Sequence, residues 1–200
     1  MQVNLTQAQE LLEKVREAYS KAADGPDGSH PFPVGYDFAL SVGYPEDVLR
    51  SLPESSVRRF TGVSNVSIFA KIPAGSTVLD FGCGSGTDSL IAASKTGPDG
   101  RIYGVDFSST MLSHARAGAS EAGATNVEFQ ESEGAHIPFA GGMFDVAVVN
   151  GIFNLNPNRT GLFQELARVI RPGGVLYGAE IVLGEAMDDE ERAGLSNWFS

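Results

Sequence analysis

The stretch from Val78 to Gly86 constrains the fold more strongly than any other part of the sequence. An apolar run there ends in Asp80 and Phe81, and glycines follow at the alternate positions 82, 84 and 86. Glycine permits a positive φ angle and lets another group approach where a Cβ would block it. The first N–H groups of a following helix favour an anionic group. The stretch therefore predicts a strand, a tight turn and a helix that together bind a nucleotide-like cofactor; a turn that binds nothing is the alternative.

The spacing of the glycines separates two classes of cofactor. The dinucleotide fingerprint G-x-G-x-x-G/A places its third small residue where this chain has Thr87. Here the third glycine comes one position earlier, at Gly86. The pattern G-x-G-x-G preceded by an acidic residue resembles motif I of the class I S-adenosylmethionine-dependent methyltransferases. An NAD-linked oxidoreductase is disfavoured by the same spacing.

A second acidic residue, Asp106, follows the apolar segment that begins at Ile102. It lies about one strand–helix–strand unit after the glycines, where a carboxylate can accept hydrogen bonds from the hydroxyls of a ribose. The alternative is that Asp106 caps the next helix. Phe107 and Met111 are candidates for packing against an adenine, with ordinary core packing as the alternative.

Three later segments extend the resemblance. Glu133, followed by Ile137-Pro138-Phe139, is similar to the family's segment in which an acidic residue contacts the adenine amino group, with the Gly134 N–H near the ring. Asn150 ends a strand-like run at the edge where open α/β sheets bind ligands. The segment 168–176 resembles a late family signature that contains Pro-Gly-Gly. The resemblance implies S-adenosylmethionine as cofactor, S-adenosylhomocysteine as product, and these cofactor-binding residues: Asp80, Gly82, Cys83, Gly84, Gly86, Asp106, Phe107, Met111, Glu133, Gly134 and Asn150.

Strands and helices are predicted to alternate from about residue 75 onward. The predicted strands are 76–81, 101–106, 126–130, 144–149 and 174–183. The predicted helices are 87–95, 109–122 and 159–170. This alternation predicts an α/β fold with a Rossmann-like, mostly parallel sheet. We assign residues 73–200 to that domain.

Residues 1–72 show no strand alternation, and we expect them to form an N-terminal helical cap. Its predicted helices are 4–23, 45–52, 54–60 and 65–70. The resemblance implies a seven-stranded sheet, of which this chain accounts for five strands. We therefore expect a sheet that lacks the last two strands and forms a homodimer through its exposed edge.

Composition excludes several classes of partner. The net charge of −11 disfavours nucleic acid as a substrate, since an acidic surface repels phosphates. No apolar run reaches the roughly 18 residues of a membrane span, and the N-terminus lacks a signal-peptide pattern, so we expect a cytoplasmic protein. One cysteine and three histidines without ligand spacing give no metal site. A small-molecule acceptor is the remaining expectation.

Within the family the chain resembles the arsenite methyltransferase-like and quinone-biosynthesis-type enzymes, the former in segments 43–49 and 149–155. As(III) prefers sulfur ligands. The resemblance to the arsenite group implies thiolates near Val63 and at Gly151, where this chain has no cysteine. Cys83 is expected to point into packing, so the residues argue against arsenite as acceptor.

The sequence does not assign a catalytic residue. Four side chains are weak candidates for a general base: Tyr36, Tyr44, His136 and Asn154. A non-catalytic S-adenosylmethionine-binding module, acting as a sensor or partner subunit, is the alternative function.

Overall fold

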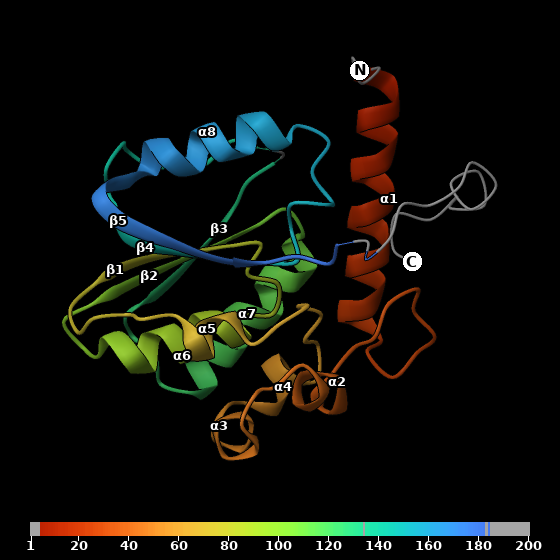
Figure 1. The fold of residues 1–200 in the computed structure, drawn as a ribbon. Helices are drawn as coiled ribbons and strands as arrows, with labels where there is room; N and C mark the ends of the chain where they lie inside the picture. The colour runs from red at the N-terminus through yellow and green to blue at the C-terminus, as the bar shows by residue number, and fades with distance from the viewer. Residues whose placement is uncertain (1–4, 134, 183, 185–200) are drawn as a thin grey trace.

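The computed structural model describes residues 5–133, 135–182 and 184. Its centre is a parallel sheet with the strand order β3-β2-β1-β4-β5. The strands are β1 (Thr77–Phe81), β2 (Arg101–Asp106), β3 (Val127–Glu131), β4 (Phe144–Asn150) and β5 (Ile170–Ala179). The sheet confirms the predicted Rossmann-like α/β fold (Figure 1).

Three helices connect the strands and cover both faces of the sheet. Helices α6 (Thr87–Thr96) and α7 (Ser109–Glu121) lie on one face, and α8 (Arg159–Val169) lies on the other (Figure 1). The chain moves outward from β1 in one direction through β2 and β3, and then returns to β4 on the other side of β1. The carboxyl ends of β1 and β4 therefore flank the switch point at which open α/β sheets bind ligands.

Burial on both faces explains why the central strands are almost continuously apolar. Along β4, Val146 and Val148 pack with the cluster that includes Ala92 of α6. Ala147 and Val149 pack with the cluster of α8 on the opposite face. Successive side chains of a strand point to opposite faces, so a strand buried on both sides needs apolar residues at every position.

Five helices precede the sheet: α1 (Leu5–Asp24), α2 (Tyr36–Ser41), α3 (Glu46–Ser51), α4 (Glu54–Val57) and α5 (Val66–Phe69). Figure 1 shows α1 standing beside the end of the sheet, with α2–α4 grouped below it. Helix α1 contacts α7, where Ser20 Oγ lies 2.9 Å from Ser108 Oγ. Tyr44 and Phe60 pack in one cluster with Ile91 of α6, which anchors the short helices to the sheet layer.

Several predicted helix bounds in the N-terminal third were wrong. Helix α2 was not predicted; it follows Gly35, which takes a φ of 98° that the sequence pattern did not reveal. The predicted helix 54–60 ends at Val57, because the amides of Arg59 and Phe60 donate to carbonyls three residues back instead of four. Pro45 is the N-cap of α3 and not its first residue.

The last strand was also placed too late. Strand β5 begins at Ile170, directly after α8, and the predicted strand residues 180–182 lie beyond its end at Ala179. Phe144 pairs with Ile170 and Val146 pairs with Val175, so the Pro-Gly-Gly segment forms a bulge within the strand. A bulge accommodates a proline and a glycine that regular pairing disfavours. Residue 183 lies outside the described residues.

Candidate functional site

The glycine turn connects β1 to α6 at the switch point. Gly82, Gly84 and Gly86 have φ angles of 77°, 51° and 85°, a region that favours glycine. A Cβ on Gly86 would lie 3.1 Å from Phe129 Cζ and 3.2 Å from Ala115 Cβ. Gly86 therefore closes the helix against the strand layer, the role that the dinucleotide fingerprint gives to a residue one position later.

The amide groups of this turn are used within the protein. Gly82 N and Cys83 N donate to Val105 O at 2.7 and 3.0 Å, and Gly86 N donates to Cys83 O at 2.9 Å. Gly84 N donates to Asp106 Oδ2 at 2.8 Å. These four amides are therefore occupied within the protein; the prediction of an anionic group at the N-terminus of the helix concerns the amides of α6 that follow them.

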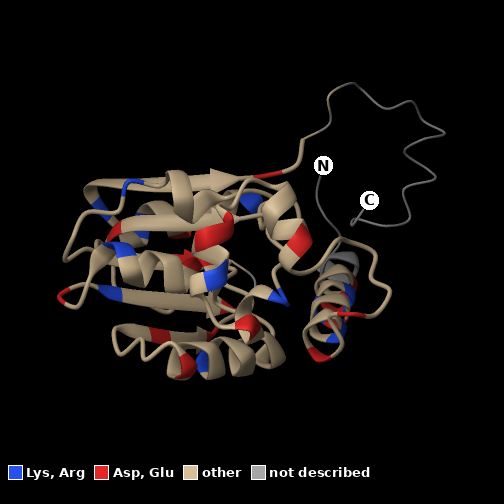
Figure 2. Cartoon of the chain, turned by 90° about the horizontal axis from the view of Figure 1, so that it is seen from below, with Lys and Arg blue, Asp and Glu red and all other residues tan. Residues whose placement is uncertain are grey.

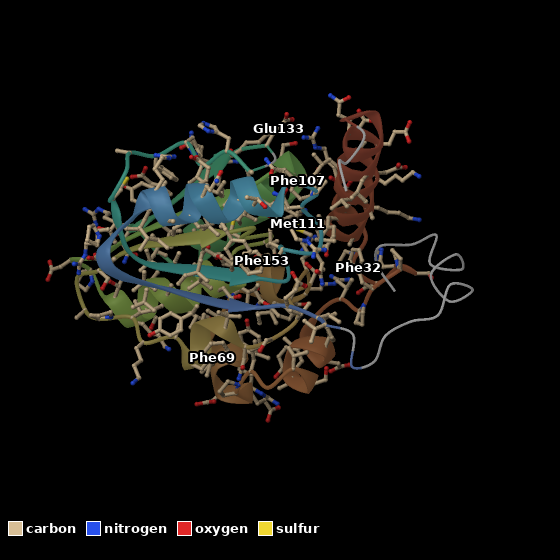
Figure 3. The ribbon with its side chains drawn as sticks, turned by 45° about the horizontal axis from the view of Figure 1, so that its top comes forward. Phe32, Phe69, Phe107, Met111, Glu133 and Phe153 are labelled. Atoms are coloured by element: carbon tan, nitrogen blue, oxygen red, sulfur yellow. The ribbon has the colours of Figure 1, made fainter. Side chains whose placement is uncertain are left out.

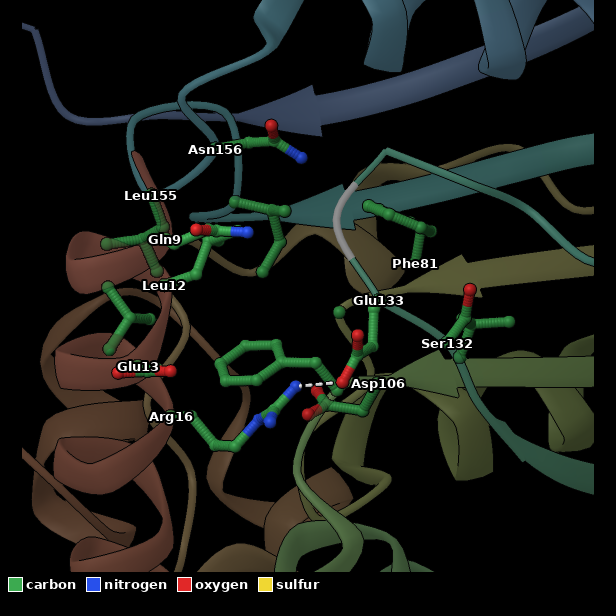
Figure 4. Close-up of a pocket in the computed structure, with 15 residues that line it drawn as sticks. Gln9, Leu12, Glu13, Arg16, Phe81, Asp106, Ser132, Glu133, Leu155 and Asn156 are labelled. Atoms are coloured by element: carbon green, nitrogen blue, oxygen red, sulfur yellow. Dashed lines mark hydrogen bonds and ion pairs between the residues drawn. The ribbon is translucent and has the colours of Figure 1, made fainter. Parts of the chain in front are cut away.

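A cavity of about 380 Å³ lies between α1 and the carboxyl edge of the sheet. Figure 4 shows Gln9, Leu12, Glu13 and Arg16 of α1 on one side, facing Phe81, Asp106, Ser132 and Glu133. Residues that follow β4 complete the wall, among them Ile152, Leu155 and Asn156. The cavity thus combines an apolar lining with carboxylates at the strand ends.

A smaller hollow of about 40 Å³ adjoins this cavity. Its walls are the glycine turn with Asp80 and Asp88 on one side and the segment Arg59–Gly62 on the other. The cavity and the hollow share five lining residues: Gly82, Asp106, Phe107, Ile152 and Leu155. The two spaces are therefore neighbouring parts of one site along the ends of β1, β2 and β4.

Asp106 lies where the two spaces meet. It is 7% exposed, and its two oxygens accept hydrogen bonds from Gly84 N at 2.8 Å and Ser108 N at 2.9 Å. Burial raises the pKa of this carboxyl, and these hydrogen bonds partly oppose the rise. The cap of α7 is Ser108, whose Oγ accepts from Met111 N at 3.2 Å. The side chain of Ser108, and not that of Asp106, therefore caps the helix. A carboxylate has about four acceptor sites, so Asp106 retains acceptor capacity for a ligand.

Two further carboxylates, Asp80 and Asp88, are buried beside the turn. Asp80 is 2% exposed and accepts from Ser89 Oγ at 2.5 Å; burial and then the charge of Asp88 raise its pKa to about 8. Asp88 is 6% exposed and accepts from Tyr44 Oη at 2.6 Å, from Asn150 Nδ2 at 2.8 Å and from Ser67 Oγ. Within the described part of the chain, no ion pair joins Asp80, Asp88 or Asp106 to a Lys or Arg. A positively charged ligand would favour the ionised forms of these buried carboxyl groups and would oppose the rise in the pKa of Asp80.

The far end of the cavity carries the predicted adenine contacts. Figure 3 labels Phe107 and Glu133 beside α1. Glu133 Oε1 accepts from Arg16 Nη2 at 2.5 Å, and the Arg16 guanidinium lies 5.9 Å from the centroid of the Phe107 ring. An ionised carboxylate has about four acceptor sites, so Glu133 can bind a second donor alongside Arg16.

Two predicted site residues, Met111 and Asn150, are not open to a ligand in the expected way, and a third, Cys83, has its side chain in packing as predicted. Met111 is 1% exposed within α7 and lines neither of the two spaces. Cys83 is buried in the turn as predicted, and burial raises the pKa of its thiol well above the ordinary value. The side-chain amide of Asn150 is occupied by protein groups, although the residue borders the hollow. Gly134 lies outside the described residues.

The four candidates for a general base do not converge on the site. Tyr44 is hydrogen-bonded to Asp88, and burial raises its pKa well above the ordinary value. His136 is exposed, and its Nδ1 lies 3.7 Å from Glu165 Oε2. Asn154 Nδ2 donates to Ile181 O at 2.6 Å. Tyr36 belongs to α2, and none of the four lines the cavity or the hollow.

Some of the lining residues were missed at the level of sequence. Asp88 carried a local signal, as an acidic residue two positions after the last glycine of the turn. The wall from α1 carried none, because amphipathic spacing does not tell which partner a helix contacts. The segment Thr61–Gly62 likewise borders the hollow, a contact that its neighbours in sequence do not indicate.

The described residues bear on three classes of partner: nucleic acid, a membrane and a metal ion. In Figure 2, the Lys and Arg positions are spread over several elements. None of the helices described is long and apolar enough to cross a membrane. Over the same residues, no group of three or more His, Cys, Asp or Glu side chains is arranged to hold a metal ion.

Comparison with known proteins places the chain in a family. Residues 72–199 match the family described as a methyltransferase domain. An arsenite methyltransferase of Halobacterium salinarum is 36% identical over 149 residues, which are 74% of this chain and 38% of that protein. A demethylmenaquinone methyltransferase of Lactococcus lactis is 34% identical over 100 residues, 50% of this chain and 40% of the relative. The chain thus spans about two fifths of the length of these relatives.

Solved structures agree with this placement. The arsenic(III) S-adenosylmethionine methyltransferase of Chlamydomonas reinhardtii superposes with a TM-score of 0.61 at 26% identity, over 78% of this chain and 51% of that one. The [4+2]-cyclase SpnF superposes with a TM-score of 0.64 at 23% identity, over 88% of this chain and 62% of the other, and supports the fold alone. The family match, the sheet order and the glycine turn agree, and the chain belongs to the class I S-adenosylmethionine-dependent methyltransferases.

Proposed function

We propose that this chain binds S-adenosylmethionine across the cavity and the hollow and transfers its methyl group to a small organic molecule. One observation carries the proposal: three buried carboxylates, Asp80, Asp88 and Asp106, meet at the glycine turn without a Lys or Arg partner among the described residues. S-adenosylmethionine carries a sulfonium and an ammonium group, and these charges would favour ionisation of the buried carboxyl groups, Asp80 among them.

Each end of the cofactor has a matching group in this site. Asp106 would accept from the ribose hydroxyls, Phe107 would pack against the adenine, and Glu133 would accept from its amino group. The hollow beside Asp80 would take the amino-acid end. The bound cofactor supplies an electrophilic methyl group. The protein would align the acceptor with that group and keep water away, for which α1 and the residues after β4 form the walls.

The charge of the site argues against a dinucleotide. NAD carries a pyrophosphate, which would lie against the same carboxylates, and the amides at 82, 83, 84 and 86 already donate within the protein. Calorimetric titration with S-adenosylmethionine and with NAD distinguishes the two ligands. Binding of NAD, or no binding of S-adenosylmethionine, would overturn the proposal.

The acceptor proposed is a phenol or quinol. The relatives described above are named for arsenite and demethylmenaquinone. A Cβ on Gly151 would lie 2.9 Å from Val63 Cγ1, so the two positions that would need thiolates for arsenite face each other and hold none. The remaining thiol, Cys83, is buried. Soft As(III) therefore lacks its preferred ligands here.

Release of S-adenosylhomocysteine over a panel of thiols, phenols, quinols and arsenite tests turnover. Product with a phenol or quinol supports the proposed acceptor, and product with arsenite alone contradicts it. Because none of the four candidate bases lines the cavity or the hollow, a module that binds the cofactor without turnover is the second candidate. Cofactor binding without product over the whole panel would favour that candidate.

We also propose that residues 1–72 act as a cap on the domain 73–200 and that two copies of the chain pair through β5. Among the described residues β5 pairs only with β4, and Val175 and Phe163 nearby are 45% and 51% exposed. An edge strand of this kind favours pairing with a second chain. Light scattering at high protein concentration should give the mass of a dimer, and a monomeric mass would contradict the pairing.

A further inference from the structure

We infer that Asn150 and Tyr44 are positioning residues that hold the cap segment 61–64 against the glycine turn and thereby form the hollow for the amino-acid end of the methyl donor. The inference rests on the proposed function, because it names the part of the cofactor that the hollow receives. It assigns Asn150 a role other than direct contact with the cofactor.

The side-chain amide of Asn150 is saturated by groups from the cap and from α6. Its Oδ1 accepts from Val63 N at 2.9 Å and Ser64 N at 3.1 Å. Its Nδ2 donates to Ser64 O at 2.7 Å and to Asp88 Oδ2 at 2.8 Å. An amide with one acceptor oxygen and two N–H donors has little capacity left for a ligand. The residue therefore fastens the segment 63–64 to the end of β4 and to the start of α6.

Tyr44 contacts both Asn150 and its partner Asp88. Its hydroxyl donates to Asp88 Oδ1 at 2.6 Å and lies 3.3 Å from Asn150 Nδ2. The ring is 2% exposed and packs edge-on against Phe60, with a centroid distance of 4.9 Å. Phe60 immediately precedes the segment 61–64, and the tyrosine hydroxyl also lies 3.1 Å from Ser64 O, so the tyrosine contacts that segment at both ends.

The segment held in this way leaves a narrow space. Thr61 and Gly62 form one wall of the hollow of about 40 Å³, and Asp80, Gly82 and Gly84 form the other. Gly62 lies so close to Asn150 Nδ2 that a Cβ there would overlap it. A space of this size admits a few water-sized groups, since about 10–15 Å³ holds one. It suits a compact polar head such as an ammonium group, whereas a nucleobase belongs in the larger cavity.

The experiment compares two ligands that differ only at the end in question. S-adenosylhomocysteine carries the amino-acid group, and 5′-methylthioadenosine shares its adenosine and thioether but lacks that group. Both are titrated by calorimetry into the wild-type chain, Tyr44→Phe and Asn150→Ala. Tyr177→Phe and Asn126→Ala are the matched controls. Tyr177 packs against Phe69, and Asn126 donates to Gly97 O; neither residue borders the hollow.

We expect Tyr44→Phe and Asn150→Ala to weaken S-adenosylhomocysteine about five- to tenfold, which corresponds to the loss of one or two hydrogen bonds. Affinity for 5′-methylthioadenosine should stay within about twofold, because the adenosine contacts are unaffected. Hydrogen exchange of the Val63 and Ser64 amides should become faster in Asn150→Ala, since both donate to its side chain. Tyr44→Phe removes a single hydroxyl, so it decides the question if Asn150→Ala does not fold.

Two results would overturn the inference while leaving cofactor binding intact. One is that the variants weaken both ligands equally, or neither. The other is that the wild-type chain binds the two ligands with the same affinity, because the amino-acid end would then have no site. If the wild-type chain binds neither S-adenosylmethionine nor S-adenosylhomocysteine, the proposed function itself fails, and the inference fails with it.

Discussion

Gly82 and Ile152 lie in direct contact at the switch point of the sheet. A Cβ on Gly82 would overlap Cδ1 of Ile152, and Gly82 also has a φ of 77°. The residue is therefore restricted to glycine by backbone conformation and by the close approach of a side chain from the segment after β4. This contact joins the glycine turn to a wall of the cavity.

A pair of substitutions separates these two restrictions. Gly97 has a φ of 72°, and a Cβ at this residue would meet no atom within 4 Å, so Gly97→Ala reports the backbone cost alone. We expect Gly97→Ala to lower the free energy of unfolding by about 1–3 kcal/mol, because its φ of 72° and ψ of −174° suit glycine almost alone. Gly82→Ala should cost about 1–3 kcal/mol more, because Ile152 must also shift. Urea unfolding measures both values, and equal losses would show that the contact with Ile152 has no energetic weight.

Replacement of Asp106 tests the predicted ribose contact. Asp106→Ala should weaken S-adenosylmethionine binding by at least about 1–3 kcal/mol, because charge-assisted hydrogen bonds are lost. Part of that loss reflects the bond from Gly84 N, which Asp106→Asn can keep. Asp106→Asn cannot accept from Ser108 N at the same time, so a smaller loss in Asp106→Asn than in Asp106→Ala would measure the part carried by the bond from Gly84 N. Asp99→Asn removes an exposed carboxylate away from the site and serves as control; unchanged affinity in Asp106→Ala would withdraw the assignment.

Asp80 makes the stability of the protein depend on pH. Its pKa in the folded state is about 8, against an ordinary value of 3.8, because burial and Asp88 oppose ionisation. Folding therefore favours the protonated form. The cost is absent below about pH 4, grows between pH 4 and 8 as the unfolded state ionises, and is complete above pH 8.

Asp80→Asn imitates the neutral carboxyl and can still accept from Ser89 Oγ. We expect it to match the wild-type chain in stability near pH 4 and to exceed it by a few kcal/mol at pH 8.5. Denaturant unfolding at several pH values gives the difference between the two curves. A difference that does not change with pH would contradict a raised pKa for Asp80.

Arg168 connects α8 to the segment that follows Glu133. It donates to Phe139 O and to Ile137 O, both at 2.8 Å, and Glu165 Oε2 accepts from Ile137 N at 3.1 Å. Arg168→Met should destabilise the protein by about 1–3 kcal/mol, because it removes the donor of the Phe139 carbonyl and one of the two donors of the Ile137 carbonyl, which keeps the Phe139 amide. Arg50→Met, which breaks an exposed pair with Glu46, should cost less than about 0.5 kcal/mol. Equal effects of the two changes in thermal or urea unfolding would show that the bonds to the two carbonyls add nothing.

The pair of Arg168 and Glu165 also makes the stability of the protein depend on pH in the acid range. The hydrogen bond from Arg168 lowers the pKa of Glu165 to about 2. The stabilisation from this carboxylate is therefore present above its ordinary pKa of 4.5 and is lost as the pH falls through about 2. Unfolding curves between pH 5 and pH 2 should show this loss in the wild-type chain and a smaller loss in Arg168→Met. Parallel curves would rule out the pair as its source.

The sheet and its ligand-binding edge could be predicted because their signals are local. Val78 to Phe81 and Val146 to Val149 are apolar at nearly every position, as expected for strands buried on both faces. Each acidic residue at a strand end and each glycine of the turn is defined by its immediate neighbours in sequence. The bounds of β5 were missed because its bulge depends on pairing with β4, which the sequence does not display.

The sequence by itself determined the fold class, the family and the kind of cofactor. The signals for them, above all the spacing of Gly82, Gly84 and Gly86, lie within single short segments of the chain. The tertiary structure decided which side chains are free to act. Asn150 is engaged by Val63, 87 positions away, and Glu133 by Arg16, 117 positions away. It also buried Asp80 and Asp88 together, and among the described residues neither forms an ion pair with a Lys or Arg. Hydrogen-bond saturation and burial arise only when distant segments meet, and these physical effects distinguish residues that position the site from residues that remain open to a ligand.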